Sequence, residues 1–240
     1  MTYCVGLLLN EGLVLLSDTR TNAGLDNISV YRKMFTFEQP GERVIVMMTA
    51  GNLSVTQTTL ARLNEAIESP DATPATSIMQ AESMLDVATI TGEMLSRVTA
   101  ETQARMDRMT QAAGASMIVA GQRKGGRMRL FLIYPEGNFI EATEDTPYLQ
   151  IGEHKYGKPI LDRVITAHTP LDEARKAVLL SMDSTLRSNL SVGMPLDMAV
   201  IKVDALRVSE QRRIEANDED FAAMSAAWSQ ALRDAFAQIA

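Results

Sequence analysis

The sequence predicts an α+β protein, built from grouped strands and grouped helices. Its 240 residues are 46% hydrophobic and 22% charged, which is typical of one globular domain with a core of several layers. Short apolar runs bounded by turn residues fill the first third of the chain, and helical patterns then occur in pairs. The order is strands, two helices, strands, two helices, a strand and a final helix. This grouping favours two packed sheets with helix layers outside them.

Strands are predicted where an apolar run ends at turn residues. Asn10-Glu11-Gly12 separates the first two runs and predicts a hairpin. Gln39-Pro40-Gly41-Glu42 supplies the turn before Arg43–Ala50, a strongly apolar run that predicts a buried strand. The predicted strands cover residues 2–9, 13–17, 32–38, 43–50, 115–121, 128–134, 139–142, 148–151 and 198–203.

Helices are predicted where apolar residues recur every three or four positions. The first follows Gly51-Asn52 and ends at Ser69-Pro70. The second begins near Ala75 and extends to about Met109, with Gly92 as a candidate interruption. Three more helices are predicted over residues 156–166, 171–188 and about 217–240. We expect a single domain over residues 1–240, with the last, amphipathic helix as an extension.

Composition and charge disfavour several classes of function. The net charge is −7, from 30 acidic and 23 basic residues, which is a poor match for nucleic acid, although a local basic patch is compatible with it. The single cysteine, Cys4, cannot form an intrachain disulfide and fits a reducing cytoplasm. No apolar run is long enough to cross a membrane, and no basic signal-peptide segment precedes Cys4–Leu9. We therefore expect a cytoplasmic protein with no nucleic-acid or membrane partner.

Metal and cofactor sites are not expected. The two histidines, His154 and His168, are too few and too far apart in the sequence for a metal site. The glycine-containing stretch Gly121–Gly126 lacks the Lys-Ser/Thr ending of a phosphate loop. We therefore expect no metal and no cofactor.

A threonine in the second position is the first feature that carries chemistry. Removal of Met1, which is usual before a small residue, would leave Thr2 with a free α-amine. Such a residue can be nucleophile and base at once, because the amine accepts the hydroxyl proton and titrates near neutral pH. Many proteins begin Met-Thr, so this feature alone is weak. The apolar run after Thr2 nevertheless predicts a terminus held in a sheet.

Two charged features lie near strand ends. Ser17-Asp18-Thr19-Arg20 directly follows an apolar run, where a plain surface ion pair is the common explanation. Arg32-Lys33-Met34-Phe35 places a lysine at the entry to another strand, where lysines are usually solvated. If Lys33 points inward it needs a partner of opposite charge, and Asp18 is the candidate.

Taken together, these residues resemble the β-subunits of the proteasome family. In that family a processed Thr is followed by a hairpin, an Asp in an S-D-x-R turn, a Lys, and an Ala-Gly step that opens the first helix. This chain has Thr2, Asp18, Lys33 and Ala50-Gly51 in the same order and strand contexts. It looks most like the bacterial group called Anbu, the proposed ancestral β-subunits, in stretches such as MTYC and SDTRTNA. The resemblance implies a four-layer αββα sandwich of two antiparallel sheets, the N-terminal nucleophile hydrolase fold.

The resemblance implies a threonine-type hydrolase of peptide or other amide bonds. Thr2 Oγ would attack a carbonyl carbon, the Thr2 amine would accept the proton, and Lys33, held by Asp18, would favour the deprotonated nucleophile. The backbone N–H of Gly51, at a helix N-terminus, would stabilise the oxyanion. Arg20 would brace the turn that carries Asp18.

Two stretches depart from the family pattern. Proteasome β-subunits carry a Gly-Ser-Gly step near the nucleophile, where this chain has Gly152-Glu153-His154. Glu153 either alters the charge near the α-amine or caps the following helix, and we favour the cap slightly. The family also carries an Asp with a Ser three residues later, a spacing that falls here on Ser188 and Ser191. The Ser is then kept and the Asp lost, unless an alignment shifted by one puts Asn189 in play.

The resemblance also predicts self-assembly. The family forms closed hexameric or heptameric rings, so we expect a hexamer-type ring or an open spiral, with stacking to a dodecamer and an unknown ATP-dependent partner as further options. Two functions stay open, an amide hydrolase and a weakly active or inactive scaffold that resembles non-catalytic proteasome α-subunits. The trio Thr2, Asp18 and Lys33 favours the enzyme, because a pure scaffold has no need of all three.

Overall fold

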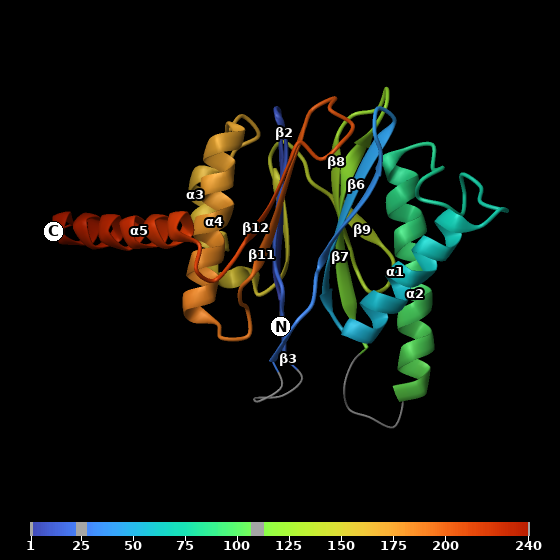
Figure 1. Ribbon diagram of the computed structural model, residues 1–240, viewed down its shortest axis with the longest axis horizontal. Coiled ribbons are helices and arrows are strands. Elements are labelled where there is room, and N and C mark those ends of the chain that lie inside the picture. Colours follow the sequence, from blue (N-terminus) through green and yellow to red (C-terminus); the bar gives the residue numbers. More distant parts are fainter. Residues whose placement is uncertain (1, 23–27, 107–112, 240) are drawn as a thin grey trace.

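Four layers make up the body of the molecule (Figure 1). The computed structural model describes residues 2–22, 28–106 and 113–239. Two five-stranded antiparallel sheets face each other, and helices cover the outer face of each. The predicted αββα sandwich is therefore confirmed.

The first sheet carries the N-terminus of the chain and is covered by two helices. Its strands in spatial order are β10 (Tyr148–Gly152), β1 (Tyr3–Leu9), β2 (Gly12–Asp18), β11 (Leu196–Lys202) and β12 (Glu210–Ile214). A 3₁₀ turn, η1 (His154–Tyr156), leads from the edge strand to the helices α3 (Lys158–Val164) and α4 (Leu171–Ser188) on the outer face.

The second sheet has the same number of strands and a longer pair of covering helices. Its strands in spatial order are β5 (Met34–Gln39), β6 (Arg43–Gly51), β7 (Ala115–Arg123), β8 (Arg129–Ile133) and β9 (Phe139–Glu141). The covering helices are α1 (Leu53–Glu68) and α2 (Met84–Met106). A small ladder of β3 (Arg20–Asn22) and β4 (Ile28–Val30) lies at the same end of the molecule as the N-terminus.

Three apolar clusters hold the layers together. Along β2, Leu13 and Leu15 pack between the two sheets, whereas Val14 and Leu16 pack towards α3 and α4. Successive side chains of a strand point to opposite faces, so the central strands are buried on both sides. The third cluster, around Phe131, joins the second sheet to α1 and α2. Burial on both faces explains why the central strands are continuous apolar runs in the sequence.

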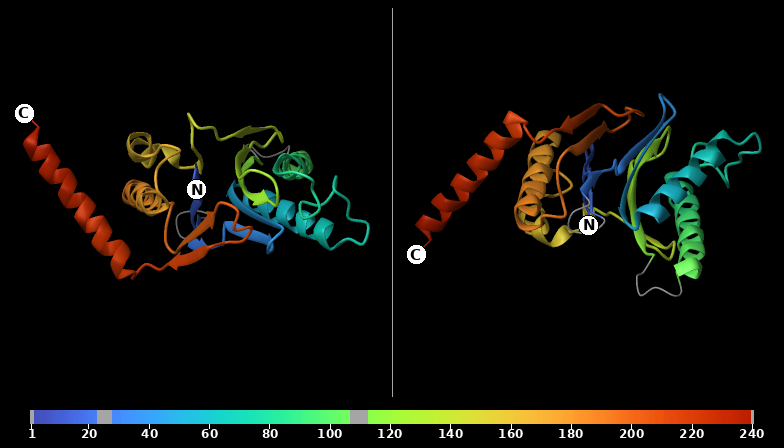
Figure 2. Two further views of the ribbon diagram at one scale, coloured as in Figure 1. Left: turned by 90° about the horizontal axis from the view of Figure 1, so that it is seen from above. Right: turned by 60° about the horizontal axis from the view of Figure 1, so that its bottom comes forward.

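The C-terminal helix α5 (Glu219–Gln238) projects away from the layered body (Figure 2). Asp218 caps its first turn by accepting the N–H of Phe221 at 2.9 Å, and Phe221 packs against the cluster of the first sheet. No residue of α5 is buried, and Phe236 near its end is 80% exposed. Among the described residues, no helix is long and apolar enough to cross a membrane.

The second helix starts later than predicted. α2 begins at Met84, whereas apolar spacing places the start near Ala75. Ile78 and Ala81 are buried as the pattern requires, but they lie before the helix, Ile78 in a turn and Ala81 in an irregular stretch. Arg43 Nη1 donates to both of their carbonyl oxygens at 3.0 Å. A side chain from another part of the chain thus replaces the helical hydrogen bonds that the pattern predicts.

Other elements also differ from the predictions. α2 runs through Gly92 without interruption, and its predicted end near Met109 lies outside the described residues. The helix predicted over residues 156–166 is split at Gly157, where a Cβ atom would lie 2.1 Å from Ser181 Oγ. The strands β3, β4 and β12 were not predicted, because they are short or, in β12, almost entirely polar.

Candidate active site

Thr2 is fixed at the start of the first sheet. It is 7% exposed, and its carbonyl oxygen accepts the N–H of Glu153 at 2.7 Å. Gly152 pairs with Tyr3 and has a φ of +82°, and a Cβ there would lie 1.9 Å from the Thr2 oxygen. The glycine is therefore required for the close approach of the two strands. This pairing holds the terminus in a sheet, as the apolar run after it predicts.

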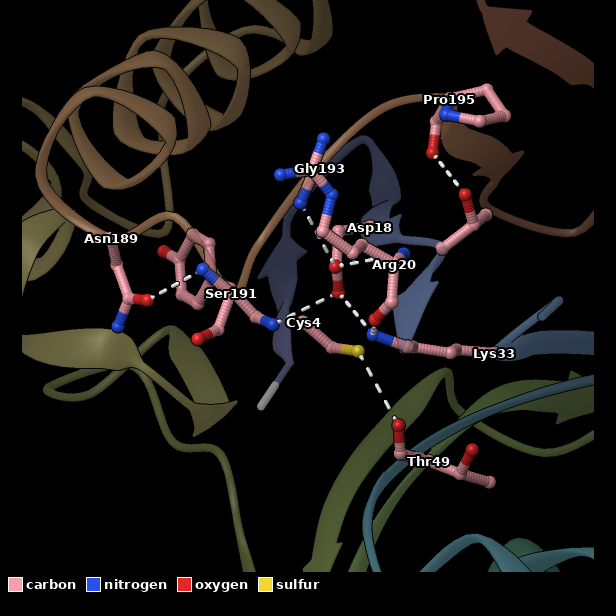
Figure 3. Close-up of polar contacts among 11 residues, drawn as sticks. Cys4, Asp18, Arg20, Lys33, Thr49, Asn189, Ser191, Gly193 and Pro195 are labelled. Carbon is pink, nitrogen blue, oxygen red and sulfur yellow. Dashed lines mark hydrogen bonds and ion pairs between the residues drawn. The ribbon is translucent and has the colours of Figure 1, made fainter. Parts of the chain in front are cut away.

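Asp18 accepts hydrogen bonds from four donors at the end of β2 (Figure 3). Its Oδ1 atom accepts the N–H of Tyr3 at 3.0 Å and the ammonium of Lys33 at 2.7 Å. Its Oδ2 atom accepts the N–H groups of Arg20 at 3.1 Å and Gly193 at 3.2 Å. Burial raises the pKa of the Asp18 carboxyl, and Lys33 and the backbone donors act in the opposite direction.

Lys33 points into the protein. It is 5% exposed and lies directly before β5. Its ammonium binds the Asp18 carboxylate and donates to the Arg20 carbonyl oxygen, with 2.6 Å between Lys33 Nζ and the Arg20 oxygen. Since Tyr3 N–H binds the same carboxylate, the ion pair is connected directly to the residue that follows Thr2. The structure thus brings Thr2, Asp18 and Lys33 together from three separate strands or strand ends.

The loop after α4 completes the surroundings of Asp18. Arg20 connects the turn that carries Asp18 to this loop, because its Nη1 atom donates to the Leu190 carbonyl oxygen at 2.8 Å. Its guanidinium also occupies the place of a Gly193 side chain, since a Cβ there would lie 2.1 Å from Arg20 Nε. Thr19 Oγ1 donates to the Pro195 carbonyl oxygen at 2.7 Å. Gly193 was missed by the sequence analysis, because only the tertiary fold brings its N–H to Asp18.

Ser188, Asn189 and Ser191 have different surroundings. Ser188 is the last residue of α4 and is exposed. Asn189 is the C-cap, and its Oδ1 atom accepts the N–H of Ser191 at 2.9 Å. Figure 3 shows Asn189 and Ser191 on the stretch that leads to Gly193. The structure therefore places Asn189 and Ser191 near the Asp18 cluster and gives Ser188 no part in it.

Gly51 and Glu153 both lie just before a helix, but neither has the position or contact at that helix that the sequence predicts. Gly51 is the last residue of β6, with a φ of +104°, and lies before the helix, whose N-cap is Asn52. Glu153 stands at the N-cap of η1, but its side chain makes no capping hydrogen bond, so the favoured capping role is wrong. Its nearest charged partner is Lys155, with 3.9 Å between the Nζ and Oε2 atoms. The backbone of Glu153, which binds Thr2, is what connects it to the site.

A buried polar network behind Thr2 was not predicted. The Tyr3 hydroxyl lies 2.6 Å from Ser181 Oγ and accepts a hydrogen bond from Gln150 Nε2 at 2.6 Å. Burial raises the pKa of Tyr3 and of the Cys4 thiol above their ordinary values, so neither side chain is poised to act as an anion. Within the described part of the chain, no group of three or more His, Cys, Asp or Glu side chains could hold a metal ion.

The fold and this cluster define the class of the protein. A family model described as proteasome subunit matches residues 2–201. Because the match covers most of the chain, the protein belongs to the proteasome subunit family. Within that family it is similar to Anbu proteins over nearly its full length.

Three solved structures illustrate the similarity. Anbu (ancestral beta-subunit) from Yersinia bercovieri is 46% identical with a TM-score of 0.92, and the match covers 99% of this chain and 97% of that one. An Anbu (Gly-1) mutant from Hyphomicrobium sp. strain MC1 is 48% identical with a TM-score of 0.92 and coverages of 100% and 98%. A helical assembly of the Anbu complex from Pseudomonas aeruginosa is 44% identical with a TM-score of 0.93, and the match covers 99% of this chain and 97% of that one. A search of curated proteins finds no match.

Proposed function

We propose that the protein is a threonine-type hydrolase that cleaves peptide or other amide bonds. The observation that carries this proposal is the buried Lys33–Asp18 ion pair, which accepts a hydrogen bond from the N–H of Tyr3, the residue directly after Thr2. A buried ion pair of this kind is weak evidence for stability alone. Its connection to the residue that follows the buried Thr2 supports a catalytic role.

In the proposed mechanism, the Thr2 hydroxyl attacks the substrate carbonyl carbon. The Thr2 α-amine, freed by removal of Met1, accepts the hydroxyl proton and gives it to the leaving amine as the C–N bond breaks, which leaves an ester on Thr2. Water then hydrolyses this ester, which releases the acid and restores the Thr2 hydroxyl. Met1 lies outside the described residues. The Lys33 ammonium favours the anionic form of the nucleophile, and Asp18 positions Lys33. The Gly51 N–H stabilises the developing oxyanion, and Ser191 supports the site from the loop after α4.

A weakly active or inactive assembly protein is the second candidate. It is favoured by Glu153 and His154, which stand where a Gly-Ser-Gly step is expected, and by Ser188, which is exposed where the family has an Asp. Both candidates share the same fold and differ only in chemistry at Thr2. A direct test of the nucleophile therefore separates them.

We propose further that the chain forms a homo-oligomer, as a spiral or a hexamer-type ring. The relative from Pseudomonas aeruginosa is described as a helical assembly. α5 supports assembly in this chain, because it carries exposed Leu232 and Phe236 on a helix without buried residues and is followed by the exposed Ile239. A cytoplasmic location and an ATP-dependent partner stay predictions from the sequence.

The nucleophile is tested with a β-lactone, an electrophile that acylates hydroxyl groups. Intact-mass measurement first establishes that Met1 is absent. We expect one adduct per chain in the wild type, no adduct in Thr2→Ala, and labelling slowed by about 100-fold or more in Lys33→Ala. Lys155→Ala, which changes an exposed lysine, is the matched control and keeps the wild-type rate. Equal labelling of wild type and Thr2→Ala would support the scaffold instead.

Assembly is tested separately by light scattering. The double variant Leu232→Ser/Phe236→Ser should lower the molecular mass of the assembly, because it removes apolar side chains from α5. Thr2→Ala should leave the mass unchanged. An unchanged mass in the double variant would show that α5 does not contribute to the interface.

A further inference from the structure

A cavity rich in arginine lies at the opposite end of the second sheet from the Thr2 site. Its volume is about 280 Å³, and it lies between the start of α2 and the β7–β8 hairpin. Gly51 pairs with Ala115 at one end of β6 and β7, and Arg43 pairs with Arg123 at the other. At about 3.3 Å per residue, these ends are about 26 Å apart. In Figure 1, α2 starts at the upper end and the N-terminus lies at the lower end.

The walls of the cavity carry more positive than negative charge. Arg123, Arg127 and Arg129 line it, whereas Glu82 is the carboxylate among the lining residues. Arg129 is paired, because its Nε and Nη2 atoms donate to the two carboxylate oxygens of Glu141 at 2.7 and 2.6 Å. The local excess stands out in a chain with a net charge of −7.

Two of the arginines have unused binding capacity. Arg127 is 76% exposed and reaches Glu141 only at 3.5 Å. Arg123 has no ion-pair partner among the described residues, and its Nε atom is buried without an acceptor. An arginine fork whose donors have no protein acceptor is suited to bind two oxygens of one anion.

Arg43 adds a buried positive charge next to the half-buried Arg123. It does not line the cavity, but it is the direct cross-strand neighbour of Arg123, and it donates to the carbonyl oxygen of Ala81, next to Glu82. No carboxylate of the described residues pairs with it, and its Nε atom also has no acceptor. Like charges directly across a strand pair destabilise each other. An anion in front of Arg123 would relieve this repulsion.

The start of α2 contributes in the same direction. Ser83 lines the cavity, and its Oγ atom accepts the N–H of Asp86 at 3.1 Å, which caps the first turn. The N-terminus of this 23-residue helix carries a partial positive charge, which is partly offset by the Asp86 carboxylate, the acceptor of a hydrogen bond from Ser83 Oγ at 2.8 Å. We infer that the cavity binds a phosphate group, either free or at the end of a larger molecule. The inference does not depend on the proposed hydrolase, because the two sites share no residue.

The test is isothermal titration calorimetry of the full chain at low ionic strength. The probes are inorganic phosphate, diphosphate and ATP, with acetate as the carboxylate control at matched ionic strength. Binding of all three phosphate compounds indicates a site for the phosphate group itself. Binding of ATP alone indicates a nucleotide as the source. We expect saturable binding of phosphate compounds and none of acetate.

Variants locate the binding in the cavity. Arg127→Gln and Arg123→Gln should weaken binding by about 10-fold each, since each loses a charge-assisted hydrogen bond. Glu82→Gln should tighten it by a few-fold. Lys124→Gln is the matched control, because it removes the same charge from the same hairpin without lining the cavity. Arg127 is largely exposed, so its variant stays folded, which is checked by thermal unfolding without ligand.

Either of two results would overturn the inference. One is the absence of measurable heat for every phosphate compound at millimolar concentration. The other is weakening by Lys124→Gln equal to that by Arg127→Gln, which would indicate a diffuse basic surface rather than a site. Loss of β-lactone labelling has no bearing on either outcome.

Discussion

Two buried cations lie at opposite ends of the second sheet and are stabilised in different ways. Lys33 precedes β5 and binds the Asp18 carboxylate at 2.7 Å. Arg43 begins β6 and binds two backbone carbonyl oxygens, with another arginine opposite it. Burial, and then the charge of Arg123, lowers the pKa of Arg43, although a guanidinium stays charged.

The two ends of the sheet differ in what compensates the buried positive charge. Removing a charge from water is costly unless an opposite charge or several dipoles replace the water. At the Lys33 end the chain itself supplies the carboxylate that pairs with the ammonium. At the Arg43 end the chain supplies only dipoles, and the neighbouring cavity remains electropositive.

The largest expected effect is the loss of the Asp18 carboxylate. Asp18→Asn leaves the Lys33 ammonium buried without an opposite charge, which should lower the free energy of unfolding by about 3 kcal/mol or more. Thermal and denaturant unfolding at fixed protein concentration measure the change. The double variant Asp18→Asn/Lys33→Met should regain part of the loss. An Asp18→Asn midpoint equal to that of the wild type would contradict the comparison.

Arg43 should matter less than Asp18. Arg43→Met removes two hydrogen bonds to carbonyl oxygens and also removes a repulsive charge, so we expect a loss of about 1–2 kcal/mol in the same unfolding experiment. Arg123→Gln removes only the repulsion and should change stability by less than about 0.5 kcal/mol. If Arg43→Met costs as much as Asp18→Asn, then the two cations are not stabilised differently.

The helix caps at the two ends allow a matched pair of variants. Asn52 accepts the N–H of Val55 at 3.2 Å at the start of α1, and Ser83 caps α2. Asn52→Ala and Ser83→Ala should each cost about 1 kcal/mol. Their functional effects should separate, because Asn52→Ala slows β-lactone labelling and Ser83→Ala weakens phosphate binding. The reverse assignment would show that the two ends are coupled.

The smallest effect concerns the Arg129–Glu141 pair beside the arginine cavity. Hydrogen bonds from Arg129 lower the pKa of Glu141 in the folded protein. The pair therefore stabilises the fold above the ordinary glutamate pKa of about 4.3, and this contribution is lost as the pH falls through the lower folded value. The stability difference between wild type and Glu141→Gln should shrink towards zero between about pH 5 and pH 3. A difference that does not change with pH would exclude an ionic contribution.

Much of the fold follows from local sequence patterns. The central strands, the hairpin at Asn10-Glu11-Gly12 and the first helix were predictable, because apolar period and turn residues act over a few neighbouring positions. The late start of α2 was not predictable, because the carbonyl oxygens of Ile78 and Ala81 accept hydrogen bonds from Arg43, which is distant in sequence. The polar strand β12 was missed for a related reason, since its place is set by pairing with β11.

The site divides in the same way. The sequence alone predicted the candidate residues Thr2, Asp18 and Lys33, because side-chain chemistry and the strand pattern around each of them can be read without the fold. Only the tertiary structure decided which of these residues lie in contact and which further groups bind them. The N–H of Gly193, which donates to Asp18, is one such group. The sequence determines which chemical groups are present, whereas hydrogen bonding and burial depend on distances that exist only in the folded chain.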